Sequence, residues 1–533
     1  MSLSTYYHTI KYLKLEQLWF QVYYKSRTKI RHLFGWKVKY TFYKEGHRIL
    51  FSPFPQKVIS YKGENTFCFL NQTHRFNGIW DDRTLGDLWR YNLNYMDFIL
   101  QPSLEVKEGV AWIEHFISAL DTNKIATDPY PISLRGINWI KFISLNWEKL
   151  SDSERKKIET SLYSQYRALY GHTERHLMAN HYLENGFSLL FAAVYFRDKF
   201  FWRKAKNIIK QQLNEQILPD GAHYELSPMY HCIILERVLD CCNLLDSATT
   251  NHFEDWDTLR NLLNRKACQM LEWLDAIVIA NDQIPLLNDS AYKIALLPET
   301  LRNYARSLGL KWGSGTLSIS GYRRIVRPHY EAVLDMAPLG VSYNLGHSHA
   351  DTGTFLLWVN GRELLVDTGT STYSAGKRRD YERSTHAHNT VVINHENSSK
   401  VWGAFRCAQR AQVIIEADGP DIYTLTHDGY RDKGIICRRS FVCKEESLEI
   451  VDIIENSASH NAVAYFHLSP SIQILKVDDY KVITNEAIFT FEGCESLQLV
   501  KKRVAEEYNI LKSSLCLHVE FSGMLHTIIH GFE

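Results

Sequence analysis

The 533-residue chain contains no long apolar run. No segment approaches the ~18 consecutive apolar residues of a membrane span. The first eight residues, Met-Ser-Leu-Ser-Thr-Tyr-Tyr-His, have neither the apolar stretch nor the small-residue cleavage site of an export signal. We therefore expect no transmembrane segment and a cytoplasmic location, or a periplasmic one if the native start differs.

A surplus of charge and a disulfide framework are also missing. The net charge at pH 7 is +1, which argues against a general polyanion-binding surface and leaves any acidic ligand to a local cluster of basic side chains. We therefore expect no nucleic-acid partner. The ten cysteines include no Cys-x-x-Cys pair, and this spacing predicts reduced, mostly buried thiols.

The apolar pattern that is present changes character along the chain. Between about residues 80 and 310, apolar residues recur at helical spacing, most clearly in 110–120, 135–145, 181–196, 201–217 and 229–245. After a glycine-rich stretch near 309–321, short β-type runs separated by turns continue to the end. The sequence predicts three parts: a basic aromatic segment (1–74), a helical domain suited to an α/α toroid (75–315) and an antiparallel β domain (316–533).

Basic and aromatic residues are mixed in the N-terminal segment. Residues 1–50 carry ten lysines and arginines against Glu16 and Glu45, interleaved with tyrosine and tryptophan. This mixture is typical of a weak membrane-surface or partner contact. A solvated basic flank explains it as well.

Residues 346–351 read Gly-His-Ser-His-Ala-Asp, and Asp367 and His388 follow within about forty residues. Imidazole and carboxylate together are ligands that zinc accepts. His349, Asp367 and His388 are therefore a candidate metal site, with one divalent ion, zinc first, as the expected cofactor. His347 is two residues from His349 and is free to face a cleft instead. Hydrogen-bonded or surface histidines are the alternative.

A predicted hairpin brings these residues together. Asn360-Gly361 lies between two apolar runs, which is a strong signal for a two-residue β-turn. Such a turn pairs Val359 with Arg362, and continued pairing sets Thr354 opposite Asp367. His388 precedes another short β-type run, so all three candidate ligands are expected at strand ends.

Polar motifs also interrupt the helical half. Asn180, His181 and Glu184 share one helical face at the start of a predicted helix, although an N-cap followed by ordinary polar positions explains them too. Residues 220–231 form a polar loop that enters another helix and supply phenol, imidazole and carboxylate groups, including Tyr230.

A third group in the helical half combines a cation, an amide and an indole. Arg135, Asn138 and Trp139 suit a sugar carboxylate and a sugar ring face. Salt-bridged helix ends are the alternative for this group.

Four motifs together resemble those of the heparinase II/III family of polysaccharide lyases. They are Asn180-His181-x-x-Glu184-Asn185, Asp220-Gly221 with Ser227-Pro228-x-Tyr230-His231, His347-x-His349-x-Asp351 and the run 383–390. The resemblance covers roughly residues 75–530. It implies an incomplete α/α toroid followed by an antiparallel β-sandwich, with an acidic polysaccharide in the cleft between them.

The resemblance also implies roles for individual residues. The reaction would be β-elimination at a 4-linked uronic acid. Asn180, with His181 beside it, would neutralise the uronate carboxylate as it gains charge. Tyr230 would be the acid, and for one epimer also the base, while His347 would be the other base. Arg135, Asn138, Trp139 and Glu184 are the expected substrate-binding residues, and His349, Asp367 and His388 match the ligands of zinc-containing members.

Two other functions use much the same residues. Removal of the C5 proton without loss of the leaving group gives a uronate C5-epimerase. A non-catalytic polysaccharide-binding or assembly protein is the second alternative. A glycoside hydrolase would need two carboxyl groups about 5–10 Å apart, and Glu184 and Glu225 are not a compelling pair.

Overall fold

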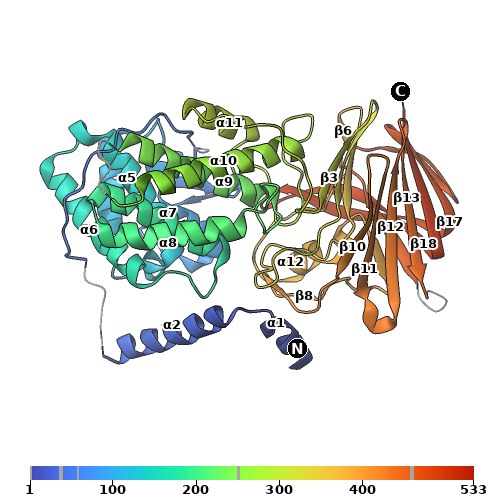
Figure 1. Ribbon diagram of the computed structural model, residues 1–533, viewed down its shortest axis with the longest axis horizontal. Coiled ribbons are helices and arrows are strands. Elements are labelled where there is room, and N and C mark those ends of the chain that lie inside the picture. The colour runs from blue at the N-terminus through green and yellow to red at the C-terminus, as the bar shows by residue number, and fades with distance from the viewer. Residues whose placement is uncertain (1–2, 35–39, 57–58, 249–252, 457–460, 533) are drawn as a thin grey trace.

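The computed structural model describes residues 3–34, 40–56, 59–248, 253–456 and 461–532. A helical part is followed by a part built from antiparallel strands, and the two lie side by side (Figure 1). This order of elements confirms the fold class predicted from the change in apolar spacing.

The helical part contains the following elements: α3 (Asp87–Tyr95), α4 (Val106–Ala119), α5 (Pro129–Leu145), α6 (Asp152–Gly171), α7 (Ala179–Phe196), α8 (Lys199–Gln216), α9 (Pro228–Ser247), α10 (Trp256–Ile277) and α11 (Pro298–Ser307). Local sequence sets several of their starts. Ser151 and Glu154 form a capping box at α6, and Asp198 caps α8. Ser227 caps α9, with Pro228 in the first turn. Almost every residue of α7 is buried, so α7 lies at the centre of this part.

The strands form one large and one small main sheet. The large sheet has the order β10-β11-β12-β13-β18-β17-β16-β15, and β14 joins β18 to β7. Its strands are β7 (Val391–Ile393), β10 (Val413–Asp418), β11 (Ile422–Tyr430), β12 (Ile435–Cys443), β13 (Ser447–Glu455), β14 (Ala462–His467), β15 (Ile474–Asp478), β16 (Lys481–Thr484), β17 (Ala487–Glu507) and β18 (Ile510–Gly531). The small sheet comprises β3 (Tyr322–Val326), β4 (Tyr330–Asp335), β5 (Phe355–Val359) and β6 (Arg362–Leu365).

The small sheet joins the two hydrophobic cores. Along β5, Phe355, Leu357 and Val359 pack into the core shared with the large sheet, whereas Leu356 and Trp358 pack into the helical core. This alternation follows from the two-residue period of a strand. The small sheet is therefore buried on both faces, and it fixes the β-sandwich against the helical part.

The Asn-Gly turn forms as predicted, but the pairing beyond it does not. Asn360 and Gly361 both have positive φ, and Val359 pairs with Arg362. A bulge then shifts the register, so that Leu357 pairs with Leu365, and β6 ends there. The expected pairing of Thr354 with Asp367 is therefore wrong, because one extra residue enters the ladder.

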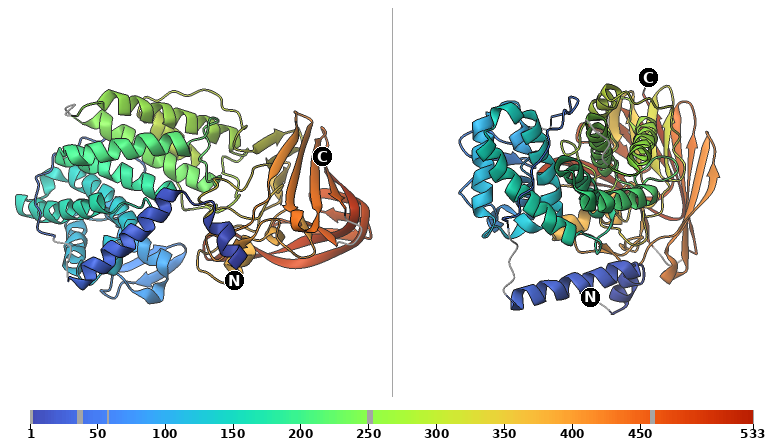
Figure 2. Two further views of the ribbon diagram at one scale, coloured as in Figure 1. Left: turned by 60° about the horizontal axis from the view of Figure 1, so that its bottom comes forward. Right: turned by 60° about the vertical axis from the view of Figure 1, so that its left-hand side comes forward.

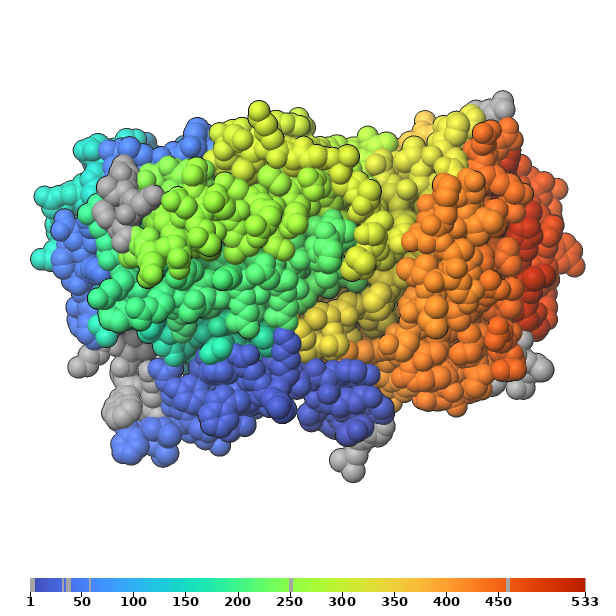
Figure 3. All heavy atoms as spheres, in the orientation of Figure 1, coloured from blue at the N-terminus to red at the C-terminus, as the bar shows by residue number. Residues whose placement is uncertain are grey.

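The N-terminal segment does not behave as one unit. Ile49, Tyr61, Phe67 and Phe69 belong to the helical core, and a small hairpin is formed by β1 (Thr66–Phe69) and β2 (Gln72–Arg75). Before them, α1 (Leu3–Ile10) and α2 (Leu15–Leu33) run along the outside of both parts (Figure 2, Figure 3). The remaining short elements are α12 (Lys377–Glu382), β8 (Val401–Trp402) and β9 (Arg406–Cys407).

Contacts to both parts hold these two helices in place. Thr9 accepts a hydrogen bond from the indole of Trp402 at 3.2 Å, and the guanidinium carbon of Arg410 lies 3.6 Å from the centre of the Tyr12 ring. On the helical side, Glu16 pairs with Arg175 at 2.6 Å.

No helix among the described residues is long and apolar enough to span a bilayer. All ten cysteines are free thiols and eight are buried, which confirms the prediction from their spacing.

Candidate active site

A buried carboxylate, Asp289, organises the site. It lies in the segment between α10 and α11 and accepts hydrogen bonds from His347 Nδ1 at 2.9 Å and His349 Nε2 at 2.8 Å. Arg379 on α12 approaches both of its oxygens, at 2.5 and 2.7 Å. Burial alone would raise the Asp289 pKa, but Arg379 and the two histidines hold it well below its usual range. Asp289 is thus a fixed anion that ties the helical part to the β part.

Tyr230 and His347 face each other across the same junction. Their rings stack with centroids 3.9 Å apart, and the Tyr230 hydroxyl lies 3.2 Å from that of Tyr373. Tyr230 is held in the first turn of α9, where its backbone N–H donates to Ser227 Oγ at 3.2 Å. Burial raises the pKa of Tyr230 well above its ordinary value, and Tyr508 adds to this effect. Tyr230 therefore carries its proton at neutral pH.

Asn180 is positioned by an unusual backbone. Met178 and Ala179 directly before it have positive φ, 61° and 51°, a conformation that costs free energy in non-glycine residues. The Asn180 amide donates to Glu225 Oε2 at 3.4 Å. Burial raises the pKa of Glu225, while His347 and His181 act to lower it. Glu225 therefore lies within electrostatic range of both histidines.

His181 is oriented by a second carboxylate. Its Nδ1 lies 3.1 Å from Glu174 Oε1, and its ring packs 4.5 Å from that of Tyr130. Asn185 holds Glu174 through its side-chain amide at 3.1 Å. Burial alone would lower the His181 pKa, but Glu174, together with Glu225 and Glu184, makes the net shift upward. The structure thus brings Asn180, His181, Tyr230 and His347 to one region.

Glu184 instead belongs to a charged network inside the helical part. Its Oε1 accepts from Arg237 Nε at 3.0 Å. Arg237 also pairs with Asp240 at 2.6 Å, and Asp240 pairs with Lys141 at 2.8 Å. All four side chains are buried. Glu184 is therefore neutralised by a protein cation in this structure.

Arg135 and Trp139 lie in the core rather than at the site. Arg135 is fully buried; it donates to the carbonyls of Asn94 and Ala126 and to Gln165, and burial lowers its pKa to about 9. Trp139 is also fully buried and packs on Phe116. The structure therefore does not bring Arg135 and Trp139 to the catalytic candidates.

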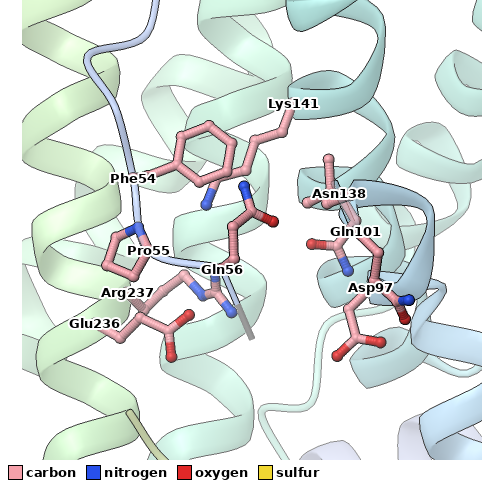
Figure 4. A pocket seen from close by; sticks show the side chains of 10 residues that line it. Phe54, Pro55, Gln56, Asp97, Gln101, Asn138, Lys141, Glu236 and Arg237 are labelled. Atoms are coloured by element: carbon pink, nitrogen blue, oxygen red, sulfur yellow. The ribbon is translucent and has the colours of Figure 1, made fainter. Parts of the chain in front are cut away.

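Asn138, in the middle of α5, lines a small cavity. Its amide donates to the Tyr95 carbonyl at 2.9 Å. The cavity also borders Lys141, Arg237 and Glu236, whose side chains point into it (Figure 4). Its volume of about 30 Å³ holds a water molecule or two rather than a sugar ring.

The three candidate metal ligands are neighbours, but they do not converge on one point. His388 Nδ1 lies 2.6 Å from Asp367 Oδ2, and Asp367 Oδ1 accepts the Gly369 N–H at 2.8 Å. The rings of His349 and His388 are 5.3 Å apart. Among the described residues, no group of three or more His, Cys, Asp or Glu side chains has metal-binding geometry.

Several polar atoms beside these residues still lack a partner. His349 Nδ1, His388 Nε2 and Asp351 Oδ2 are buried without a hydrogen bond among the described residues. Burial lowers the pKa of His349 to about 4 and raises that of Asp351 to about 6. Burial also acts to lower the pKa of His388, but Asp367 beside it makes the net shift upward. Two imidazole nitrogens and one carboxylate oxygen are donors that suit zinc. In this arrangement Asp367 orients His388 rather than sharing its position.

Comparisons with known proteins agree with this architecture. The heparinase II/III N-terminus matches residues 155–309, and the heparinase II/III-like C-terminal domain matches residues 311–523. The chain belongs to the heparinase II/III family. Within the family, it is 22% identical over 382 residues to a heparin-sulfate lyase of Bacteroides stercoris and 23% identical over 264 residues to one of Pedobacter heparinus. These matches cover 60% and 42% of this chain but only 55% and 38% of the relatives.

Solved structures of family members share the fold. A crystal structure of heparinase III superposes with a TM-score of 0.64 at 16% identity, covering 83% of this chain and 76% of that one. A mutant heparan sulfate lyase HepC from Pedobacter heparinus gives 0.58 at 16% identity, covering 88% and 81%. At such identity the likeness establishes the toroid-plus-sandwich fold.

Sequence reasoning missed the residues that position the family motifs. Asp289 and Arg379 were not candidates, nor were Tyr373 and Glu174. Asp289 is 58 residues from His347 in the chain, so no local spacing connects them. Arg379 follows two other basic residues in a short helix, and its sequence context does not distinguish it from a solvated cation.

Proposed function

We propose that this protein is a polysaccharide lyase that cleaves a uronic-acid-containing polysaccharide by β-elimination. The observation that carries the proposal is the stacked pair of Tyr230 and His347, 3.9 Å apart, where the helical and β parts meet. One group that holds a proton and one that accepts a proton are what this reaction needs. The family relatives named heparin-sulfate lyase support the substrate class.

His347 is suited to remove the C5 proton. Its Nδ1 faces the Asp289 carboxylate at 2.9 Å, so Nδ1 carries the hydrogen and Nε2 is left as the basic nitrogen. Tyr230 is suited to protonate the departing O4, because burial keeps its phenol protonated. A base role for Tyr230 would first require bound substrate to lower its pKa.

Asn180 is suited to neutralise the substrate carboxylate. Its amide donates to Glu225 at a long 3.4 Å, so a uronate oxygen can compete for the same donor. His181, whose pKa is raised chiefly by Glu174 against the effect of burial, adds positive charge beside it when protonated. The interactions of both residues with the substrate carboxylate would strengthen as negative charge builds on it in the transition state. Glu184 and Asn138 remain proposed substrate contacts only if binding rearranges their present partners.

We also propose one structural zinc ion held by His349, His388 and a neighbouring carboxylate, either Asp367, as the sequence predicts, or Asp351, whose Oδ2 is buried without a hydrogen bond among the described residues. The support is chemical: both imidazoles have a buried nitrogen without a hydrogen bond among the described residues. When bound, zinc would pin the strand ends that carry these residues and so steady His347. No proton transfer in the proposed reaction depends on it.

An assay of purified protein with a panel of uronate polymers tests the proposed reaction. β-Elimination leaves an unsaturated uronate, which absorbs in the ultraviolet. A uronate C5-epimerase would instead exchange the C5 hydrogen with solvent deuterium without this absorbance. Binding of a polymer with neither signal would leave the non-catalytic alternative and overturn the lyase.

We further propose that the outer face of α2 makes a weak contact with an anionic bilayer. Leu15, Trp19, Val22, Ile30 and Leu33 are all exposed and recur at multiples of three or four residues, so they share one face. Lys25 and Lys29, both exposed, flank that face. An apolar stripe with tryptophan and flanking lysines is suited to an anionic lipid surface.

Sedimentation with vesicles tests this contact. Vesicles containing phosphatidylserine should retain the protein and neutral vesicles should not, and Trp19→Ala should reduce retention. If Trp19→Ala and wild type sediment equally with both vesicle types, the lipid contact is wrong. Concentration-dependent dimerisation lost in Trp19→Ala would assign the stripe to a second copy instead.

A further inference from the structure

A second basic feature lies on the β part, outside the cluster around Asp289. A groove of about 610 Å³ opens between α12, the segment after β14 and the β17–β18 hairpin. Four cations line it: Arg378, Lys501, Lys502 and Arg503. No aspartate or glutamate is among its lining residues. In a chain whose net charge is only +1, this is a local concentration of positive charge.

Most of these cations are not neutralised by the protein. Lys501, Lys502 and Arg503 make no ion pair within the described part of the chain. Arg378 pairs with Glu382 at 2.7 Å. Lys501 and Arg503 lie on one face of β17 and Lys502 lies on the other, because successive strand residues alternate. An anion lying along this part of β17 would therefore meet these cations without having to displace a protein carboxylate from them.

The other lining groups suit a sugar. Ser469, Ser513 and Ser514 contribute hydroxyl groups, and Tyr381 contributes an aromatic ring. Lys502 Nζ lies 5.3 Å from the centre of the Tyr381 ring. Hydroxyls, an aromatic ring and cations together can bind the hydroxyl groups, the ring face and the acidic substituents of a polysaccharide.

The groove is close to the proposed active site but separate from it. Helix α12 contributes Arg379 to Asp289 on one side and Arg378 and Tyr381 to the groove on the other. The two regions are therefore separated by roughly one helix diameter, about 10 Å. A chain of several sugars can reach both.

We propose that this groove is an accessory binding site for an acidic stretch of the polysaccharide, recognised through its sulfate or carboxylate groups. The proposal deepens the proposed lyase function and rests on it for the substrate class. An accessory site of this kind would retain long chains after cleavage and would matter little for short ones.

Direct binding provides the test. The probe is a fluorescent heparin octasaccharide, measured in a Tyr230→Phe background so that turnover cannot consume it. Lys502→Ala/Arg503→Ala should weaken binding by about fivefold to twentyfold, the effect of losing two charge contacts. Lys476→Ala removes an exposed cation on β15 that is not among the lining residues of the groove, and this variant should bind within twofold of the parent.

A second arm identifies the recognised group. An unsulfated hyaluronan octasaccharide carries carboxylates alone. If the double variant loses affinity for heparin but not for hyaluronan, the groove recognises sulfate. If it loses affinity for both probes, the groove accepts either anion. Equal affinity of the double variant and its parent for both probes would overturn the proposal. Because binding is measured without turnover, this outcome is distinct from failure of the lyase assay.

Kinetics add a further check if a polymer substrate is found. In the otherwise wild-type chain, Lys502→Ala/Arg503→Ala should raise KM for the polymer at least threefold. It should leave kcat and the rate on a tetrasaccharide unchanged. A loss of kcat on the tetrasaccharide would show that the two residues act on the active site, which contradicts an accessory role.

Discussion

His347 Nδ1 and Asp289 Oδ2 lie 2.9 Å apart, although they come from different structural parts of the molecule. The same carboxylate binds Arg379 through both oxygens and accepts a hydrogen bond from His349. One buried anion therefore selects the tautomer of the proposed base and joins the segment after α10 to α12. Function and interdomain stability should depend on it together.

Replacement of Asp289 tests this double role. Asp289→Asn leaves the Arg379 guanidinium buried without its counter-charge, which should lower the free energy of unfolding by about 3–5 kcal/mol. It also removes the acceptor that fixes the His347 tautomer, so kcat/KM should fall on the order of 10²-fold or more. Chemical denaturation and steady-state kinetics measure the two effects.

A nearby aspartate is the matched control for this change. Asp282 pairs with Arg302 at the surface, with 39% of its side chain exposed. Asp282→Asn should therefore cost about 1 kcal/mol or less and leave kcat/KM unchanged. If the two variants were equally stable and equally active, Asp289 would have no special role.

The proposed acid and base should each be needed for turnover. Tyr230→Phe and His347→Ala should each lower kcat by at least ~10²-fold, the usual effect of losing a positioned acid or base. Tyr230→Phe removes only a hydroxyl whose partner is Tyr373, so its melting temperature should stay near that of wild type. A purified variant that keeps the wild-type rate on a confirmed substrate would contradict its assigned role.

The sequence predicted the features that rest on local periodicity and turn chemistry. The Asn360-Gly361 turn formed because both residues adopt positive φ readily. The bulge beyond it was not predictable, since the turn residues set only the first pairs of the ladder and not the register further along it. The side-chain types of Arg135 and Trp139 suggested a sugar contact but did not reveal that both residues lie in the core. Because α5 is buried on nearly all sides, its apolar pattern does not indicate which face meets the cleft.

Long-range partners were beyond such reasoning. Even the nearby pair of Glu174 and His181, seven positions apart, could not be predicted. The residues Met178 and Ala179 between them have positive φ, and no helix or turn propensity indicates that conformation for methionine or alanine. Arg379 reaches Asp289 from 90 residues away. The motif residues were identified by chemistry and resemblance, whereas the groups that orient them are set by the tertiary fold.

Asn180 should act mainly in the chemical step. Asn180→Ala removes a donor whose value grows as the carboxylate gains charge, so kcat should fall roughly 10²–10³-fold with little change in KM. Asn180→Asp adds a repelling charge at the same position and should be at least as slow. Separate determination of kcat and KM decides the matter, and an effect confined to KM would make Asn180 a simple binding residue.

The ion pair between His181 and Glu174 should make stability depend on pH. Because the folded-state pKa of His181 is raised above its ordinary ~6.5, the stabilisation is fully present below about that pH and is lost as pH rises through the folded-state pKa. The difference in unfolding free energy between wild type and His181→Gln should thus be larger at pH 5 than at pH 9. Glu174→Gln should reduce this dependence to the smaller effect of Glu225 and Glu184, and a flat or reversed difference between wild type and His181→Gln would refute the pairing.

The proposed zinc site can be tested without any substrate. Protein purified without added metal should contain about one zinc per chain by elemental analysis, and chelation should lower its melting temperature, because the ion holds the strand ends together. His349→Ala and His388→Ala should lose the metal. His395→Ala, an exposed histidine on the same β part, should keep it. Less than a tenth of an equivalent, with no change in melting temperature on chelation or zinc addition, would leave His349, Asp367 and His388 as a hydrogen-bonded cluster in which Asp367 serves only to orient His388.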